Sequence, residues 1–175
     1  KLFLQGKDRI LGLNSFNGQT LWSWELPGLN RFNMPRDCSN WCLGPDSAYV
    51  ALDGFCWQLD SADGNQLAQF SASELYNQDL PEEQHENMNW GYVAHVGDTF
   101  LGSATRPGNT FTDWWGGTYW YDAREGSATA KVCSDALFAL PSQSSERKWI
   151  YRGGLILNTT ITVADDTIYF LENRS

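Results

Sequence analysis

The stretch NTFTDWWGGTYWYDAREG, residues 109–126, contains the residue types of a binding loop. Its aromatic side chains gather around Gly116-Gly117, and indole and phenol rings stack on sugar faces and on proline rings. The stretch is therefore a candidate site for a carbohydrate or peptide ligand. Gly-Gly between aromatic flanks is also typical of a hairpin tip, with the rings packed over a neighbouring sheet, and we favour this structural role. The candidate ligand-binding residues here are Trp114, Trp115, Tyr119 and Trp120.

A basic residue in a second loop could bind an anion. The segment NMPRDCSNWCLG, residues 33–44, contains Arg36, whose planar guanidinium can clamp an anionic ligand. Its neighbour Asp37 offers a simpler partner within the loop. We favour an ion pair or a backbone contact for Arg36 and keep the ligand site as the alternative.

The histidines give weak signals for metal binding or catalysis. His85 lies among acidic residues in SASELYNQDLPEEQHENMNWG, residues 71–91, and imidazole with carboxylates can hold a transition metal. A charged run of this kind is more often a solvated surface loop, which is the interpretation we favour. His95 lies inside the strand-like YVAHV, where we expect a structural histidine instead of a catalytic base.

The cysteines leave more than one possibility open. No two of them are adjacent, and none form a C-x-x-C motif. Cys38 and Cys42 are close enough in sequence to bridge across a loop, so a disulfide and free thiols both remain possible. The histidines supply no obvious second half of a metal site, which disfavours metal binding. The four cysteines are Cys38, Cys42, Cys56 and Cys133.

Composition narrows the class of protein. The chain has 175 residues, enough for one domain, and its 16 glycines and 14% aromatic content favour β structure. A net charge of -9 argues against nucleic acid as a partner and against docking on an anionic membrane surface. No stretch approaches the roughly 18 apolar residues that membrane insertion requires. The chain opens directly in the strand-like KLFLQGKDRILGL, so we expect a mature product or a fragment.

A repeated pattern occurs on either side of these candidate residues. LNSFNGQTLWSW (13–24) aligns with LDSADGNQLAQF (59–70) and LPSQSSERKWIY (140–151). Each copy opens with leucine, continues into a turn, ends on an aromatic residue and follows an apolar strand. Such internal copies are typical of repeat architectures.

The strands around each copy predict a unit of about four antiparallel strands. The clearest hairpin signal is Asp53-Gly54, between two apolar runs. A period of about 45 residues with four strands per unit is typical of propeller blades. The predicted units cover about 1–28, 45–74, 90–151 with an insertion at 109–133, and the start of a further unit at 160–175.

The pattern of leucine, an acidic residue or asparagine, a turn glycine and a tryptophan resembles the repeat of pyrroloquinoline-quinone (PQQ)-type β-propellers. The sequence as a whole looks most like the PQQ-like repeat proteins of bacteria such as planctomycetes. The resemblance implies that Trp22 and Trp149 dock against neighbouring blades, and that Gly18 and Gly64 permit the tight turns. Ala68 and Ser145 depart from the pattern, one at a docking position and one at a turn position.

The resemblance also implies the architecture. Closed propellers of this family have about seven or eight blades, whereas this chain has room for three to four. We therefore expect a partial propeller that is a fragment of a longer chain, with closure by self-association as the alternative. Either arrangement would cover the edge strands and apolar surface left open at the two ends.

Two functional classes occur among such propellers: quinoprotein alcohol dehydrogenases and a non-enzymatic outer-membrane assembly lipoprotein. In the dehydrogenases, PQQ stacks between a tryptophan and a disulfide of adjacent cysteines, and calcium is held by Glu, Asn and Asp. This sequence has no adjacent cysteine pair. We therefore predict a non-catalytic binding or scaffolding module in a periplasmic or secreted bacterial protein, without a cofactor, whose partner is the remaining blades or another protein.

Two alternatives to this function stay open. The first is part of a PQQ- and calcium-dependent dehydrogenase. The second is carbohydrate binding through the aromatic insertion, because its aromatic residues are not explained by the repeat. Fold alone does not decide among these functions.

Overall fold

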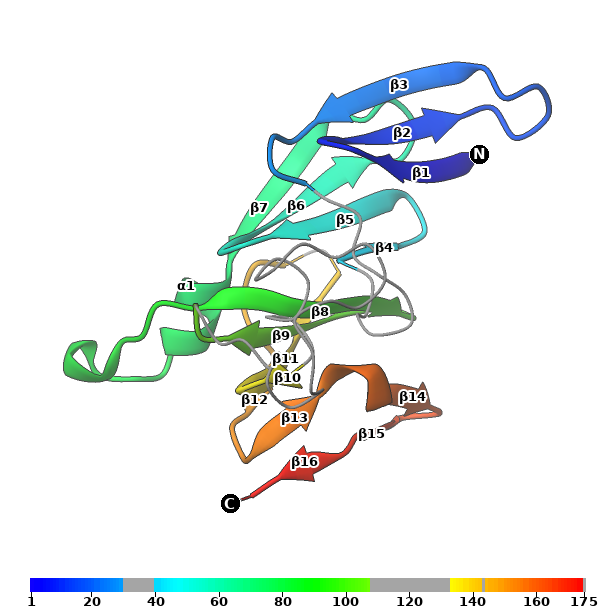
Figure 1. The fold of residues 1–175 in the computed structure, drawn as a ribbon. Helices are drawn as coiled ribbons and strands as arrows, with labels where there is room; N and C mark the ends of the chain where they lie inside the picture. The colour runs from blue at the N-terminus through cyan, green and yellow to red at the C-terminus, as the bar shows by residue number, and fades with distance from the viewer. Residues whose placement is uncertain (30–39, 108–132, 143, 175) are drawn as a thin grey trace, which may run out of the picture.

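The computed structural model describes residues 1–29, 40–107, 133–142 and 144–174. These residues form antiparallel sheets that follow one another along the chain, with the N-terminal strands at one end and the C-terminal strands at the other (Figure 1). The prediction of an all-β chain built from antiparallel units is confirmed.

The first sheet has three strands, in the order β1-β2-β3. The two-residue turn Lys7-Asp8 joins the first two strands, and Gly6 pairs with Arg9 across it. Gly12 and Trp22 are cross-strand neighbours, and the Trp22 ring lies so close to Gly12 that a Cβ there would collide with it. The strands are β1 (Leu2–Gly6), β2 (Arg9–Leu13) and β3 (Thr20–Glu25).

The second sheet has four strands, in the order β4-β5-β6-β7. The predicted hairpin at Asp53-Gly54 is confirmed, because this turn joins β5 to β6 with Leu52 opposite Phe55. The sheet begins at Trp41, slightly before the predicted unit that starts at about 45. The strands are β4 (Trp41–Leu43), β5 (Ser47–Leu52), β6 (Phe55–Asp60) and β7 (Gln66–Ser71).

The third sheet also has four strands, in the order β12-β11-β9-β8. Its strands lie on both sides of the predicted insertion at 109–133, of which only Cys133 belongs to the described residues. The strands are β8 (Asn89–Val96), β9 (Thr99–Thr105), β11 (Ala136–Pro141) and β12 (Trp149–Tyr151).

The last strands are short. β13 pairs with both β10 and β16, and β14 and β15 form a separate hairpin. One turn of 3-10 helix, η3 (Asn158–Thr160), follows β13. The strands are β10 (Cys133–Ser134), β13 (Leu155–Leu157), β14 (Thr162–Ala164), β15 (Thr167–Tyr169) and β16 (Glu172–Asn173).

The turns before β3 and β7 have the same geometry. Gly18 donates its N–H to Asn14 at 2.8 Å, and Gly64 donates to Asp60 at 2.9 Å. Both glycines have a positive φ, 73° and 78°, which a side chain would strain. The third copy of the repeat has Ser145 at this position. Its turn contains a different hydrogen bond, from the N–H of Ser144 to the carbonyl of Pro141.

Apolar side chains fill the spaces between successive sheets. Between the second and third sheets, Tyr49 stacks on Phe100 at 4.3 Å, and Trp90 meets Phe138 edge to face at 5.2 Å. Smaller clusters lie between the first and second sheets and between the third sheet and the last strands. Each sheet is therefore held by packing against its neighbours in the series.

The interpretation of 71–91 as a solvated loop is wrong for its first part. Residues Ala72–Asn77 form a short helix, α1, in which Leu75 and Tyr76 are buried. Ser71 begins the helix, since its side chain accepts a hydrogen bond from the N–H of Glu74. A single 3-10 turn, η1 (Glu82–Gln84), follows, and its residues are exposed as expected of a surface segment.

Candidate functional site

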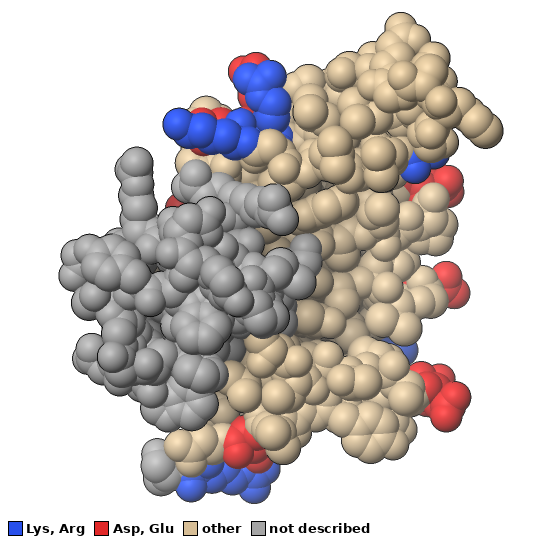
Figure 2. Space-filling view, turned by 45° about the vertical axis from the view of Figure 1, so that its right-hand side comes forward, with Lys and Arg blue, Asp and Glu red and all other residues tan. Residues whose placement is uncertain are grey.

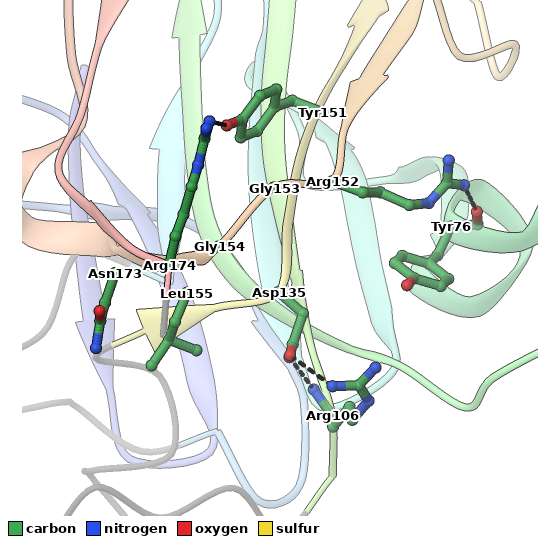
Figure 3. A pocket seen from close by; sticks show the side chains of 10 residues that line it. All are labelled: Tyr76, Arg106, Asp135, Tyr151, Arg152, Gly153, Gly154, Leu155, Asn173 and Arg174. Atoms are coloured by element: carbon green, nitrogen blue, oxygen red, sulfur yellow. Dashed lines mark hydrogen bonds and ion pairs between the residues drawn. The ribbon is translucent and has the colours of Figure 1, made fainter.

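A polar groove lies where α1, the third sheet and the last strands meet. Its volume is about 710 Å³. Three arginines from separate parts of the chain, Arg106, Arg152 and Arg174, line it together with Asp135, Tyr76 and Tyr151 (Figure 3). We call it the arginine groove.

The first wall is built on Arg106, just after β9. Its Nε and Nη2 donate to the two carboxylate oxygens of Glu86, at 2.6 and 3.1 Å. Its Nη1 donates to Asp135 at 2.9 Å, and its backbone N–H reaches the other oxygen of Asp135 at 3.0 Å. The hydrogen bonds from Arg106 hold the pKa of Glu86 below its usual range.

The second wall is built on Arg152, just after β12. Its Nη2 and Nη1 donate to the two oxygens of Asp79, at 2.7 and 3.2 Å. The buried guanidinium of Arg147 binds the same carboxylate at 2.7 Å. Hydrogen bonds from Arg152 and then Arg147 hold the pKa of Asp79 well below its usual range. The Arg152 guanidinium also lies over the Tyr76 ring, 4.8 Å from its centroid.

The third wall is formed by the end of the described chain. Arg174 is ion-paired with Glu172 and donates from Nη2 to the hydroxyl of Tyr151 at 2.6 Å. The Tyr151 hydroxyl in turn donates to Glu172 at 2.7 Å, and the N–H of Gly154 donates to the same oxygen at 3.1 Å. The hydrogen bond from Tyr151 contributes most to lowering the pKa of Glu172.

These networks determine what the groove can do chemically. Arginine hydrogen bonds lower the pKa of Asp79 and of Glu86, and the hydrogen bond from Tyr151 does most to lower that of Glu172, so at neutral pH these carboxylates are ionised. Within the described ranges, no three His, Cys, Asp or Glu side chains are grouped as metal ligands would be. The guanidinium groups that line the groove can bind an anionic group electrostatically.

The structure brings one predicted docking residue into direct contact with the next sheet. Trp22, on β3, is buried, and its Nε1 donates to the carbonyl of Ser61 at 3.2 Å. Its ring lies over the backbone of Gly64, in the turn that leads to β7. Gly18 occupies the equivalent turn of the first sheet, where a Cβ would meet nothing within 4 Å.

The second predicted docking residue has a similar setting. Trp149, on β12, is partly buried and packs against a cluster that contains Leu137, Ile156 and Ile161. Leu137 belongs to the same sheet as Trp149, whereas Ile156 lies on β13 and Ile161 follows η3, so this cluster joins the third sheet to the segment after it. A docking role for Trp149 is consistent with this position.

The predicted ligand-binding residues lie outside the part of the chain that the structure describes. This holds for Trp114, Trp115, Tyr119 and Trp120 of the insertion and for Arg36. Their proposed roles in carbohydrate, peptide or anion binding remain predictions.

The histidines both have hydrogen-bond partners. Nε2 of His95 is bonded to the Ser142 hydroxyl at 2.8 Å, and its ring stacks on Tyr49. Burial lowers the pKa of His95 against a smaller opposing effect of Asp98. Nε2 of His85 lies 3.0 Å from the carbonyl of Leu80. These contacts fit the structural role expected for His95.

Cys42 and Cys133 carry free thiols. Cys42, Cys56 and Cys133 lie on three different strands, while Cys38 is outside the described residues. Burial raises the pKa of Cys42 to about 12 and that of Cys133 to about 11, so both are poor nucleophiles and poor metal ligands at neutral pH.

The described residues do not reproduce the PQQ and calcium site that the family resemblance implies. The sequence has no adjacent cysteines to form the disulfide on which the quinone stacks. The described cysteines are on separate strands, and the carboxylates nearest the groove are already bound by arginine.

Sequence analysis missed the arginine groove. Arg106, Arg152 and Arg174 are far apart in the chain and occur in no shared motif. Ion pairs with Asp79 and Asp135 join parts of the chain that are distant in sequence. No local pattern could therefore have indicated that these side chains share one site.

The charge distribution on the surface is uneven. In the face shown in Figure 2, acidic side chains recur along one margin, and the described surface near the middle is largely uncharged. In the part of the chain that is described, no helix has the length and apolar character needed to cross a membrane.

No protein-family model and no curated protein matches the sequence. Solved structures do match it. BamB from Moraxella catarrhalis superposes with a TM-score of 0.52 at 14% identity, over 95% of this chain and 41% of BamB. Quinohemoprotein alcohol dehydrogenase from Comamonas testosteroni superposes with a TM-score of 0.49 at 14% identity, over 87% of this chain and 19% of the enzyme.

The similarity to BamB concerns the fold. The chain has the fold of a partial PQQ-like β-propeller, as its repeats predicted. It spans less than half the length of BamB, since the match covers 41% of that protein. At 14% identity the similarity carries no activity or ligand over to this chain.

Proposed function

We propose that the chain is a non-catalytic PQQ-like propeller module that binds a further propeller blade and serves as a scaffold in an extracytoplasmic bacterial protein. The fold supports the propeller module. The bacterial, extracytoplasmic setting rests on the resemblance of the repeats. The proposal includes no cofactor.

The single observation that carries the binding role is the open edge of the first sheet. The repeats align β3 with β7, so β1 corresponds to β5 of the second sheet and to β9 of the third. In those sheets, β5 pairs with β4 and β9 pairs with β8. Among the described residues, β1 pairs with β2 alone.

The outer edge of β1 has no partner strand among the described residues, and β1 carries exposed apolar side chains. Leu2 and Leu4, which alternate along β1, are 49% and 45% exposed. An edge strand of this kind is a template for pairing with another strand. An added strand would take the place next to β1 that β4 has next to β5, and a further blade would pack over these leucines as the second sheet packs over the first.

Hydrogen exchange on the protein tests this role. We expect the β1 amides that point away from β2 to be protected to a degree similar to amides in β5, which lies between two strands. Leu4→Lys should increase exchange in β1, because a charged residue disfavours edge pairing. Leu67→Lys, at a 54% exposed leucine on β7, is the matched control and should leave β1 unchanged.

Sedimentation equilibrium identifies the source of the added strand. Protection that is independent of concentration in a monomer indicates a blade of the same polypeptide, and protection that follows dimer formation indicates a second copy. Rapid exchange of the outward β1 amides at every protein concentration would overturn the proposed function.

A further inference from the structure

We infer that the arginine groove binds a carboxylate-rich peptide segment of a partner protein. The inference rests on the proposed binding function and names the chemistry of a second contact, distinct from the β1 edge. The groove and β1 belong to opposite ends of the series of sheets (Figure 1).

On two walls of the groove the charges are layered, with cations outside and carboxylates behind them, whereas on the second wall Asp79 is more exposed than Arg152. Arg106 is 50% exposed, whereas Asp135 beneath it is 13% exposed. Arg174 is 70% exposed, and its partner Glu172 is 16% exposed. On those two walls, a ligand that enters the groove therefore meets guanidinium groups first, although the whole chain has a net charge of -9.

The guanidinium groups retain donors for a ligand. Each guanidinium carries five N–H donors in a planar fork. Arg106 directs three of them to Glu86 and Asp135, which leaves two within the described residues.

The lining favours a peptide over an acidic glycan. Sugars stack on open aromatic faces, but Arg152 covers a face of Tyr76, and Tyr151 packs edge to face with Phe170 at 5.3 Å. The groove instead exposes the backbone at Gly153 and the side-chain amide of Asn173. These groups can hydrogen-bond to the peptide units of an extended segment.

A binding titration with synthetic probes tests the inference. The probe is a capped hexaglutamate peptide, with hexaglutamine as its neutral counterpart and oligogalacturonate as an acidic glycan, each followed by calorimetry at low ionic strength. We expect hexaglutamate to bind and the other two not to bind. Binding should weaken as salt is added, because part of the attraction is screened.

Matched arginine variants locate the binding site. The double variant Arg106→Gln/Arg174→Gln should weaken hexaglutamate binding by about tenfold or more, since both outer cations are lost. Arg9→Gln is the control, because Arg9 is an exposed arginine paired with Glu25 on the first sheet. If the double variant does not fold, Arg174→Gln alone takes its place in the titration, because it removes the most exposed cation of the groove.

Each outcome decides the inference. Loss of binding in the groove variants with unchanged binding in Arg9→Gln supports it. Absence of hexaglutamate binding, equal weakening in Arg9→Gln, or preference for oligogalacturonate overturns it. Hydrogen exchange at β1 is measured separately and does not depend on ligand binding in the groove. Failure of this inference is therefore distinguishable from failure of the proposed function.

Discussion

The indole ring of Trp22 lies against the backbone of Gly64, so closely that a Cβ at residue 64 would be 2.7 Å from Cδ2 of the ring. The two residues belong to different sheets, Trp22 to β3 and Gly64 to the turn before β7. The hydrogen bond from Nε1 of Trp22 to Ser61 fixes the ring over this turn. At this junction a tryptophan and a glycine join the first sheet to the second.

Substitution of each turn glycine by alanine should distinguish the energetic effect of this contact from that of backbone strain. Gly18 and Gly64 both have a positive φ, so alanine at either should cost about 1 kcal/mol of unfolding free energy. Gly64→Ala should cost about 1–3 kcal/mol more, because only there would the new Cβ collide with Trp22. Urea unfolding measures both, and equal costs would show that the ring does not dock on this turn.

Removal of the indole itself should be more destabilising. Trp22→Ala should lower the free energy of unfolding by about 3–5 kcal/mol, since it leaves a cavity between the first two sheets and the carbonyl of Ser61 without this donor. Leu21→Ala, at the exposed neighbour on β3, is the control and should cost well under half as much. Comparable losses in the two variants would contradict a docking role.

The carboxylate of Asp79 should be important for the stability of the groove. Asp79→Asn deprives the buried Arg147 and the partly buried Arg152 of their shared counterion, and should cost about 1–3 kcal/mol. Glu25→Gln breaks an exposed ion pair with Arg9 and should cost less than about 0.5 kcal/mol. Chemical denaturation of both variants provides the comparison. A cost for Asp79→Asn no greater than for Glu25→Gln would mean that the arginine network is not structural.

Stability should fall on mild acidification because of His95. Burial places its folded-state pKa below the ordinary value of 6.5, so between these two values the unfolded chain binds more protons. Unfolding free energy should therefore decrease as pH is lowered from about 7 through this window. The shifted carboxylates of Asp79 and Glu86 titrate below their ordinary values of 3.8 and 4.5, outside the window.

Replacement of the histidine isolates this effect. His95→Gln should reduce the change in denaturation midpoint between about pH 7 and pH 5.5, since glutamine does not titrate. A pH dependence in His95→Gln identical to that of the parent protein would assign the effect to another group.

Much of the fold could be predicted because the features of the repeat depend on interactions between residues that are close in sequence. The turn glycines, the alternating apolar strands and the Asp53-Gly54 hairpin each act over a few residues, and their recurrence predicts stacked antiparallel sheets. Helix α1 was missed even though Ser71 and Glu74 have the spacing of a helix N-terminus. The acidic character of 71–91 suggested a loop, but burial of Leu75 and Tyr76 against the sheets holds the helix.

The arginine groove could not be predicted in the same way. Asp79 meets Arg147 and Arg152 only because α1 packs beside the third sheet, and Arg106 meets Asp135 across an insertion. Such contacts depend on the register of distant strands. Sequence patterns report the charge of these side chains, whereas their pairing follows from tertiary packing.

The central claim is that this propeller module is non-catalytic, and titration of the purified protein with PQQ and calcium chloride tests it most directly. The readouts are the absorbance of the quinone and dye-linked oxidation of primary alcohols. We predict no saturable change in quinone absorbance and no alcohol-dependent dye reduction. Stoichiometric quinone binding with calcium-dependent alcohol oxidation would contradict the account and identify the chain as part of a quinoprotein dehydrogenase.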